Sequence, residues 1–321
     1  GLHAAAEWLL RQWKQGEQVA AIDKELQQDD EQLTAAKDNK RQWYLNGQGQ
    51  TFVILDAGEF QMGSPDSEAG HNPDESLHRR KIGRRIAIST KEVTRAQWRV
   101  FSTSQKGKVW PADQEQLNST FRTDDSPMVG MTWYEAAWYC NWLSEQEGIP
   151  EEQWCYEPND KGQYGPGMQA KEKFWELSGY RLPTEAEWEF ACRAEADSSR
   201  YYGVTEALLP RYAWYQFNGD GHTWPVASLR PNDFGLFDMQ GNAIEWVYDT
   251  FGRYPSNSED AVPDTPNSKA ISDTESRVLR GGSFYFPTSS VRSALRSSCQ
   301  PTNRDNGLHG FRPSRTYHLS P

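Results

Sequence analysis

The stretch RVLRGGSFYFPTSSVRSALRSSCQPTNRDNGLHGFRPSRTY, residues 277–317, decides how the rest of the chain is interpreted. The segments RGGSF, VRSALR and GFRPSRTY form a regular frame of arginines, glycines and small residues. Two loops of mixed composition, YFPTSS and SSCQPTNRDNGLH, separate them. The glycines predict special backbone angles or close chain approach. Arginines among aromatic residues predict buried ion pairs or stacking, and we expect this of Arg181 and Arg296. The stretch therefore predicts a rigid frame formed by the three segments. The two loops, residues 285–290 and 297–309, are loosely constrained in sequence, and we call them the filling of the frame.

The composition limits the class of protein. The chain has 321 residues, 36% hydrophobic and 13% aromatic, with a formal net charge of −11. Aromatic rings must supply much of the core. The negative charge argues against nucleic acid as a partner. The basic run HRRKIGRR (78–85) is interpreted as a solvated strand edge rather than a nucleic-acid patch. No apolar run approaches the length of a membrane span, so no membrane partner is expected.

The cysteines carry little sign of redox or metal chemistry. Cys140, Cys155, Cys192 and Cys299 form no CxxC pair and have no metal-ligand spacing. Four thiols in a chain of this length are typical of a reducing compartment, so we expect a cytoplasmic location. Cys299 stands alone near the C-terminal frame, where it is either a reactive thiol or an incidental small residue.

The rest of the chain divides into a helical extension and one larger domain. Residues 1–47 are rich in helix formers and predict an N-terminal helical extension or linker, while 48–321 form the domain. Within the domain, apolar residues at three- and four-residue spacing predict a helix over about 133–147. Thr184 followed by Glu187 is typical of a capping box at the start of a further helix.

The carboxylates of TEAEWE allow two interpretations. Glu185, Glu187 and Glu189 could supply a general acid–base pair, but alternate residues of a helix point in different directions. We therefore interpret them as a cap with exposed charges.

Six motifs in the chain resemble the formylglycine-generating enzyme and sulfatase-modifying factor family. Besides RGGSF and GFR in the C-terminal frame, they are GEFQMGS (58–64), EVTRAQWRVF (92–101), SPMVGMTWYEAAWYCNWL (126–143), GYRLPTEAEWEFACRA (179–194) and NDFGLFDMQGNAIEWVYD (232–249). The resemblance implies an α+β domain with an elaborated C-type-lectin-like fold and little regular secondary structure.

The same resemblance implies where catalysis would occur, and the sequence departs from it there. Enzymes of the family bind copper through two cysteines, the first a few residues after GGS. Here that position is Phe286, and no cysteine follows before Cys299. A copper site of this kind needs paired thiolates, so we expect no copper and no catalytic residue.

The segment FDMQGNAIEW resembles a family segment that holds a structural calcium ion. The resemblance implies carboxylate ligands from Asp238 and Glu245 and carbonyl ligands from Gly241 and Ala243. Oxygen ligands suit a hard cation. The alternative is a metal-free turn in which Glu245 accepts backbone N–H bonds.

A second branch of the family accounts for the loose filling of the C-terminal frame. It comprises the variable proteins of bacterial diversity-generating retroelements, in which template adenines are rewritten. The resulting NNY codons cannot encode Gln, Glu, Lys, Met or Trp. Composition alone predicts about six such residues in 285–309, and only Gln300 occurs there. The expected ligand-binding side chains, on one exposed face, are Tyr285, Phe286, Thr288, Ser289, Leu295, Ser297, Ser298, Cys299, Leu308 and His309. Tyr285 and Phe286 either contact the ligand or pack inward.

The sequence thus predicts a non-catalytic module that displays a hypervariable C-terminal segment (277–317) to a protein or other macromolecule. We expect it to belong to a larger bacterial protein with a fused effector or signalling domain. The alternatives are a divergent oxidase of the formylglycine-generating type and a pseudoenzyme with a constant regulatory partner.

Overall fold

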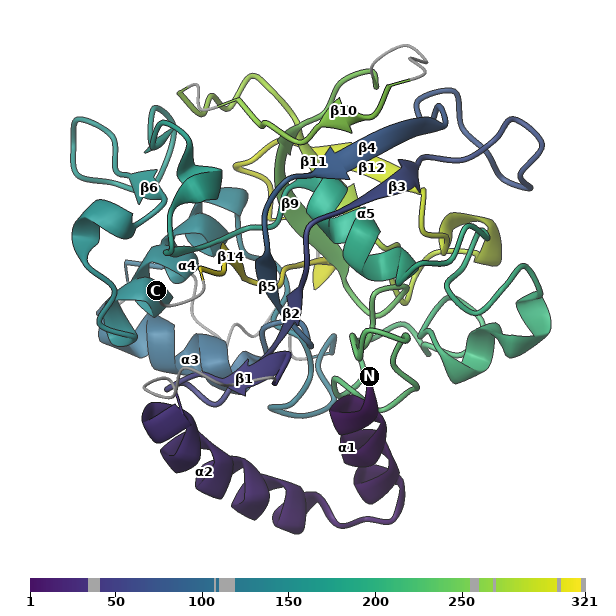
Figure 1. Ribbon diagram of the computed structural model, residues 1–321, viewed down its shortest axis with the longest axis horizontal. Helices are drawn as coiled ribbons and strands as arrows, with labels where there is room; N and C mark the ends of the chain where they lie inside the picture. Colours follow the sequence, from purple (N-terminus) through teal and green to yellow (C-terminus); the bar gives the residue numbers. More distant parts are fainter. Residues whose placement is uncertain are drawn as a thin grey trace.

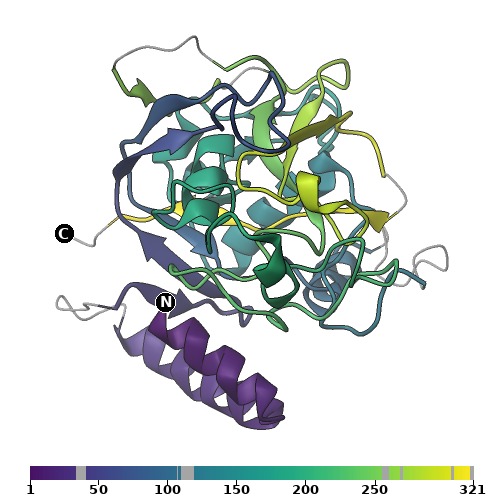
Figure 2. The ribbon, with the colours of Figure 1, turned by 90° about the vertical axis from the view of Figure 1, so that its right-hand side faces the viewer.

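A computed structural model describes residues 1–33, 41–106, 108–109, 119–254, 260–267, 270–304 and 307–318. Two helices come first: α1 (Leu2–Gln12) and α2 (Gly16–Leu33). They form an antiparallel hairpin along one side of the remaining body (Figures 1 and 2). The hairpin is attached through polar and aromatic contacts. His3 stacks on Trp43 with ring centroids 3.7 Å apart, and the Arg230 guanidinium lies 5.3 Å from the Trp8 ring.

A five-stranded antiparallel sheet joins segments from the two ends of the chain. Its order is β1 (Trp43–Leu45), β2 (Thr51–Leu55), β5 (Ile86–Ser89), β14 (Ser314–Thr316) and β8 (Tyr180–Arg181). The strand that opens this sheet therefore lies within residues 1–47, the segment expected to be helical. Because β14 lies between β5 and β8, the last described strand is an interior one.

A four-stranded sheet contains most of the C-terminal frame. Its order is β12 (Arg296–Cys299), β11 (Arg277–Arg280), β9 (Ile244–Thr250) and β13 (His309–Gly310). The pairs β12–β11 and β11–β9 are antiparallel, and β9–β13 is parallel. Strands β12 and β13 thus form opposite edges of this sheet.

A three-stranded sheet corrects one expectation. Its order is β10 (Val262–Pro263), β4 (His78–Ile82) and β3 (Gly58–Met62). The basic run at 78–85 was expected to be a solvated edge, but β4 is paired on both sides. Arg80 donates a hydrogen bond to Asp264 at 3.1 Å. Arg84, just after the strand, also donates to the carboxylate of Asp264. The run is less solvated than expected because its arginines pair with a buried carboxylate from a segment far away in the sequence, which the local sequence does not reveal.

Three helices pack on these sheets, and each begins with a capping box. They are α3 (Arg95–Ser104), α4 (Trp133–Gln146) and α5 (Glu185–Arg193), capped by Thr94, Thr132 and Thr184. The predicted helix at 133–147 and the predicted Thr184–Glu187 box are confirmed. Within the described residues, no helix combines the length and apolar composition needed to cross a bilayer.

Short elements complete the fold, which has little regular secondary structure as expected. A two-stranded sheet pairs β6 (Tyr156–Glu157) with β7 (Gln169–Ala170). The described 3-10 turns are η2 (Glu151–Gln153), η3 (Phe174–Glu176), η4 (Glu206–Arg211) and η5 (Thr288–Ser290). The core is largely aromatic, and its largest fully buried apolar side chains include Trp98, Trp133, Trp188 and Trp246.

Candidate ligand-binding site

The frame of the C-terminal segment is buried. The glycine pair after β11 takes positive φ angles, +95° at Gly281 and +73° at Gly282. A Cβ at Gly282 would lie 2.6 Å from the Ser290 carbonyl oxygen, and one at Gly310 would lie 2.9 Å from the Ala243 Cβ. Positive φ and close approach both require glycine. The glycine predictions are therefore confirmed.

Two buried arginines hold the first part of the frame. Arg280, the last residue of β11, pairs with Glu189 and donates to the carbonyl oxygens of Ser293 (2.8 Å) and Leu295 (2.7 Å). Arg292 donates to both carboxylate oxygens of Glu75, at 2.9 and 3.0 Å. Guanidinium groups that bond carboxylates and carbonyls together fix irregular backbone without a regular strand.

Two more arginines hold the second part, and the prediction of a buried Arg296 is confirmed. Arg296 pairs with Glu185 at 2.6 Å and lies 3.9 Å from the centre of the Tyr254 ring. Arg312 pairs with Glu245 at 2.6 Å. The predicted buried pairing of Arg181 is also confirmed, because it binds Glu187 at 2.6 Å and neither side chain is exposed.

The interpretation of TEAEWE was half right. The cap exists, but the charges of Glu185, Glu187 and Glu189 are buried rather than exposed. Each carboxylate neutralises arginines on other segments, and Glu189 contacts both Arg280 and Arg193. Although burial alone would raise the pKa of Glu187, Arg181 and a second arginine outweigh it and lower that pKa to about 2. Permanently ionised, paired carboxylates do not suit general acid–base work.

Between these anchors, the filling residues are mostly accessible. Tyr285 is 62% exposed, and Ser289 and Ser298 are also exposed. The half-buried candidates are Phe286, Thr288, Ser297, Cys299 and Leu308. Polar groups and one aromatic ring on turns and an edge strand can therefore contact a partner.

Two of the ten expected side chains are buried, so the prediction of exposure was wrong for them. Leu295 is 7% exposed, in the backbone segment held by Arg280. His309 is 3% exposed, because β13 pairs with β9 and its ring lies edge-on to Trp246, 4.8 Å between centroids. Since Leu308 precedes β13 on the opposite edge of the sheet from β12, the ten residues do not form one continuous face.

Phe286 takes the inward alternative in part. It packs against a cluster of Leu209, Tyr215 and Val291 as well as the main core. Its ring therefore serves as local core, whereas the adjacent Tyr285 faces solvent.

A second loop with an exposed aromatic residue was not predicted from the sequence. The backbone N–H of Gln216 donates to the backbone carbonyl of Phe286 at 3.0 Å, which places the loop 213–219 beside the loop that carries Tyr285. Phe217 on this loop is 76% exposed. A single phenylalanine in the polar stretch QFNGDG gives no sequence signal of a contact, because isolated exposed apolar residues are common.

The segment expected to bind calcium holds an excess of buried carboxylates. Glu92, Asp238 and Glu245 are buried around the guanidinium of Arg312, and Oδ1 of Asp238 has no hydrogen-bond partner. An orphaned carboxylate oxygen and uncompensated negative charge both fit a hard cation. Glu245 already bonds Arg312 and the Trp188 indole N–H.

Side chains alone do not complete that site. Among the residues the structure describes, no three His, Cys, Asp or Glu side chains converge in a metal-binding arrangement. That a calcium ion is held by Asp238 and Glu245 with the carbonyls of Gly241 and Ala243 stays a prediction.

The thiols differ sharply in accessibility. Burial raises the pKa of both Cys155 and Cys192 to about 12, and raises that of Cys140 well above its ordinary value. These three are protonated near neutral pH and unreactive as nucleophiles. Cys299 is half-buried and accepts a hydrogen bond from the Asn303 side chain at 3.0 Å.

The fold and the arginine-anchored C-terminal segment define a C-type-lectin-like domain of mixed helix and sheet. The sulfatase-modifying factor enzyme 1-like domain family matches residues 37–316, so the chain belongs to that family. A "Formylglycine-generating enzyme" of Streptomyces coelicolor is 38% identical over 152 residues, covering 42% of this chain and 46% of the relative. A "Serine/threonine-protein kinase pkn1" of Chlamydia pneumoniae is 31% identical over 186 residues, covering 58% and 23%.

A solved structure titled "Treponema denticola variable protein 1" is also similar. It superposes with a TM-score of 0.69 at 26% identity, covering 86% of this chain and 98% of that protein. The chain spans half or less of the length of the two curated relatives named above. The expected family and the resemblance to variable proteins are confirmed.

Proposed function

We propose that the chain is a non-catalytic module that binds a protein or other macromolecule through the accessible residues of its C-terminal segment. One observation carries the proposal: anchor and filling alternate within the same forty residues. Arg280, Arg292 and Arg296 are buried and ion-paired, whereas Tyr285, Ser289 and Ser298 near them in the sequence face solvent. Substitutions at buried, paired positions commonly cost several kcal/mol, while most surface substitutions stay within about 0.5 kcal/mol. A segment built this way tolerates diversification.

The exposed aromatic residues supply anchors for such a partner. Tyr285 and Phe217 project from two loops that a backbone hydrogen bond joins. Tyrosine and phenylalanine bury large areas with few rotatable bonds, which is why aromatic residues dominate binding hot spots. Phe217 lies outside the filling segments, so it would contribute a constant contact beside variable ones.

Similarity to the Treponema denticola variable protein supports diversification, and population sequencing tests it directly. The C-terminal coding region should vary at the codons for Tyr285, Ser289 and Ser298, while those for Arg280 and Arg292 stay constant. A reverse transcriptase gene beside a near-copy of the segment, mismatched at adenines, should accompany it. Equal variation at frame and filling codons, or none at either, would exclude diversification and favour a constant regulatory partner.

The competing function is a copper oxidase of the formylglycine-generating type, which the enzymatic relatives keep open. Half-buried Phe286 occupies the expected first cysteine position and cannot ligate copper. We expect no aldehyde when the protein is incubated with copper and a cysteine-containing sulfatase-type peptide, followed by mass spectrometry. Copper-dependent turnover above a protein-free blank would overturn the non-catalytic assignment.

We also propose that this module operates within a longer protein that carries an effector or signalling domain. The Chlamydia pneumoniae kinase relative supports this, because the match covers only 23% of its length. Sequencing of the complete gene tests the arrangement. A reading frame that holds this family domain alone would exclude it.

A further inference from the structure

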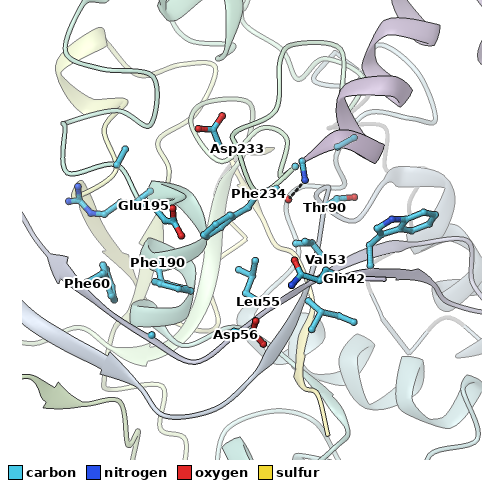
Figure 3. A pocket seen from close by; sticks show the side chains of 18 of the residues that line it. Gln42, Val53, Leu55, Asp56, Phe60, Thr90, Phe190, Glu195, Asp233 and Phe234 are labelled. Atoms are coloured by element: carbon cyan, nitrogen blue, oxygen red, sulfur yellow. Dashed lines mark hydrogen bonds between the residues drawn. The ribbon is translucent and has the colours of Figure 1, made fainter. Parts of the chain in front are cut away.

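A second candidate site lies away from the C-terminal segment. A cavity of about 660 Å³ opens between the β2–β3 turn, the end of α5, the loop 233–235 and the start of α1 (Figure 3). It is lined by none of the ten residues expected to bind a macromolecular ligand. Its volume lies within the range of small-molecule and peptide pockets.

The floor of this cavity is apolar. Val53 and Leu55 come from β2, and three phenylalanines come from β3, α5 and the loop 233–235. Phe190 lies between Phe60 and Phe234, with ring centroids 5.5 and 5.9 Å away, and all three rings are half-buried. A floor of this kind accommodates an alkyl chain and offers ring faces to a cation.

The rim of the cavity is acidic, and only part of its charge is neutralised. Asp56 pairs with Arg85 at 2.7 Å, and Glu59 pairs with Arg79 at 2.8 Å. The remaining rim carboxylates, which are Glu195, Asp197 and Asp233, are exposed and have no side-chain ion pair in the described structure. Figure 3 shows Glu195 beside Phe234 and close to Phe190.

The positive groups in the lining compensate these carboxylates only in part, since the Gly1 ammonium lies near Asp233 and donates to the Phe234 carbonyl oxygen at 3.3 Å. Arg193 is paired with Glu189 at 2.7 Å and donates to the Gly63 carbonyl at 2.6 Å. His3 is stacked on Trp43, and burial lowers its pKa, so its ring is neutral near pH 7. The cavity therefore presents net negative charge above an aromatic floor.

The chain folds so that one carboxylate is held at this rim. Helix α5 ends in two consecutive residues with left-handed angles, Ala194 at φ +47° and Glu195 at φ +72°. This ending turns the backbone away from the helix axis directly after the buried Arg193. Side chains other than glycine adopt such angles only where surrounding contacts impose them.

We infer that this cavity binds an alkyl chain ending in a positive charge, as in a lysine side chain of a peptide or a free alkylamine. The apolar stem would lie on Phe190 and Phe234. The cationic end would be placed among Glu195, Asp197 and Asp233. The chain's net charge of −11 favours the approach of cations from a distance.

The test measures binding of defined probes by calorimetry. The probes are the capped peptide acetyl-Gly-Leu-Lys-Leu-Gly-amide, its Lys→Gln counterpart, and hexylammonium. The test variant is Glu195→Gln/Asp197→Asn. The matched control is Asp160→Asn/Glu172→Gln, which removes the same charge from exposed positions near β6 and β7. A thermal melt of each variant checks that these surface changes leave the fold intact.

We expect the Lys peptide to bind the wild type and the control variant equally, with the Glu195→Gln/Asp197→Asn variant weaker by about five-fold or more. The Gln peptide should bind more weakly than the Lys peptide. Hexylammonium binding without peptide binding would identify free amines as the source of the same chemistry. Equal binding of Lys and Gln peptides, equal losses in both variants, or no binding of any cationic probe would overturn the inference.

Discussion

Replacing Arg292 by methionine should destabilise the domain strongly, although the residue lies in the C-terminal segment that we propose to vary. Its guanidinium is 1% exposed and bonds both oxygens of Glu75, which is fully buried, and one oxygen of Glu68 at 2.6 Å. Removing one partner of a buried ion pair costs about 3–5 kcal/mol, because the other charge remains without solvent or counterion. The carbonyl oxygen of Ser289 also loses its donor.

The corresponding shift in melting temperature can be estimated. The entropy of a globular protein increases by about 2.1 cal/mol/K per residue on unfolding. For a chain of 321 residues the entropy of unfolding is about 0.7 kcal/mol/K. Arg292→Met should therefore lower the melting temperature by about 4–7 °C in calorimetry at pH 7. Tyr285→Ser, in the same segment but exposed, should shift it by less than about 1 °C.

The pH dependence identifies the cause of that loss. Burial alone would raise the pKa of Glu75, but the hydrogen bonds and charge of Arg292 outweigh it and lower the pKa. A lowered carboxyl pKa contributes stability above its unfolded value, near 4.5, and this contribution disappears as the pH falls through the folded pKa. The difference between wild type and Arg292→Met should therefore shrink below about pH 4.

A second-site change supplies the control. Glu75→Gln removes the stranded charge, so Arg292→Met/Glu75→Gln should melt above Arg292→Met alone at pH 7. Melting of Arg292→Met within 1 °C of the wild type, or a loss equally large for Tyr285→Ser, would refute the division into buried anchors and free filling.

Three further outcomes are expected. Because the folded pKa of Glu187 is lowered to about 2, its pairing with Arg181 should add about 3 kcal/mol to the free energy of unfolding above pH 4.5, and this contribution is lost as the pH falls toward 2. Glu187→Gln should therefore flatten the pH dependence of the melting temperature between pH 4.5 and pH 2. An unchanged slope in this range would contradict the prediction. If calcium binds near Asp238, a chelator should lower the melting temperature of the wild type but not that of Asp238→Asn. The reason is that an ion that binds only the folded state stabilises that state. If neither a chelator nor added calcium changes the melting temperature, the turn is metal-free. A combined Tyr285→Ser/Thr288→Ala/Ser298→Ala variant should melt within about 1–2 °C of the wild type, and a larger loss would show that these side chains support the fold.

Sequence reasoning was most successful where chemistry is local. Capping boxes depend on residues three positions apart, so Thr184 and Glu187 could be paired from the sequence alone. The glycine pair after β11 was predictable for the same reason. The family motifs indicated the fold and the missing cysteine at Phe286 because they are short and contiguous.

The failures concern distant partners. Glu185, Glu187 and Glu189 were expected to be solvated, since some of the arginines that pair with them, such as Arg84 and Arg296, lie about one hundred residues away in the sequence. Leu295 and His309 were expected to be exposed, because burial by neighbouring strands cannot be recognised from the local sequence. Phe217 was missed because the hydrogen bond that joins its loop to the Tyr285 loop spans seventy residues.

The long reach of the arginine anchors has a consequence for synthesis of the protein. Arg280, Arg292 and Arg296 join partners that are 91, 217 and 111 positions earlier in the chain. A nascent chain that has not yet reached Arg280 would contain the acidic partners of the core without their counterions. Contacts of high sequence separation form late and slowly. We therefore expect the ribosome-bound domain to stay protease-sensitive until its last forty residues emerge. A prematurely terminated product would be degraded rather than displayed, so correct folding would require an intact reading frame through the segment that we propose to vary.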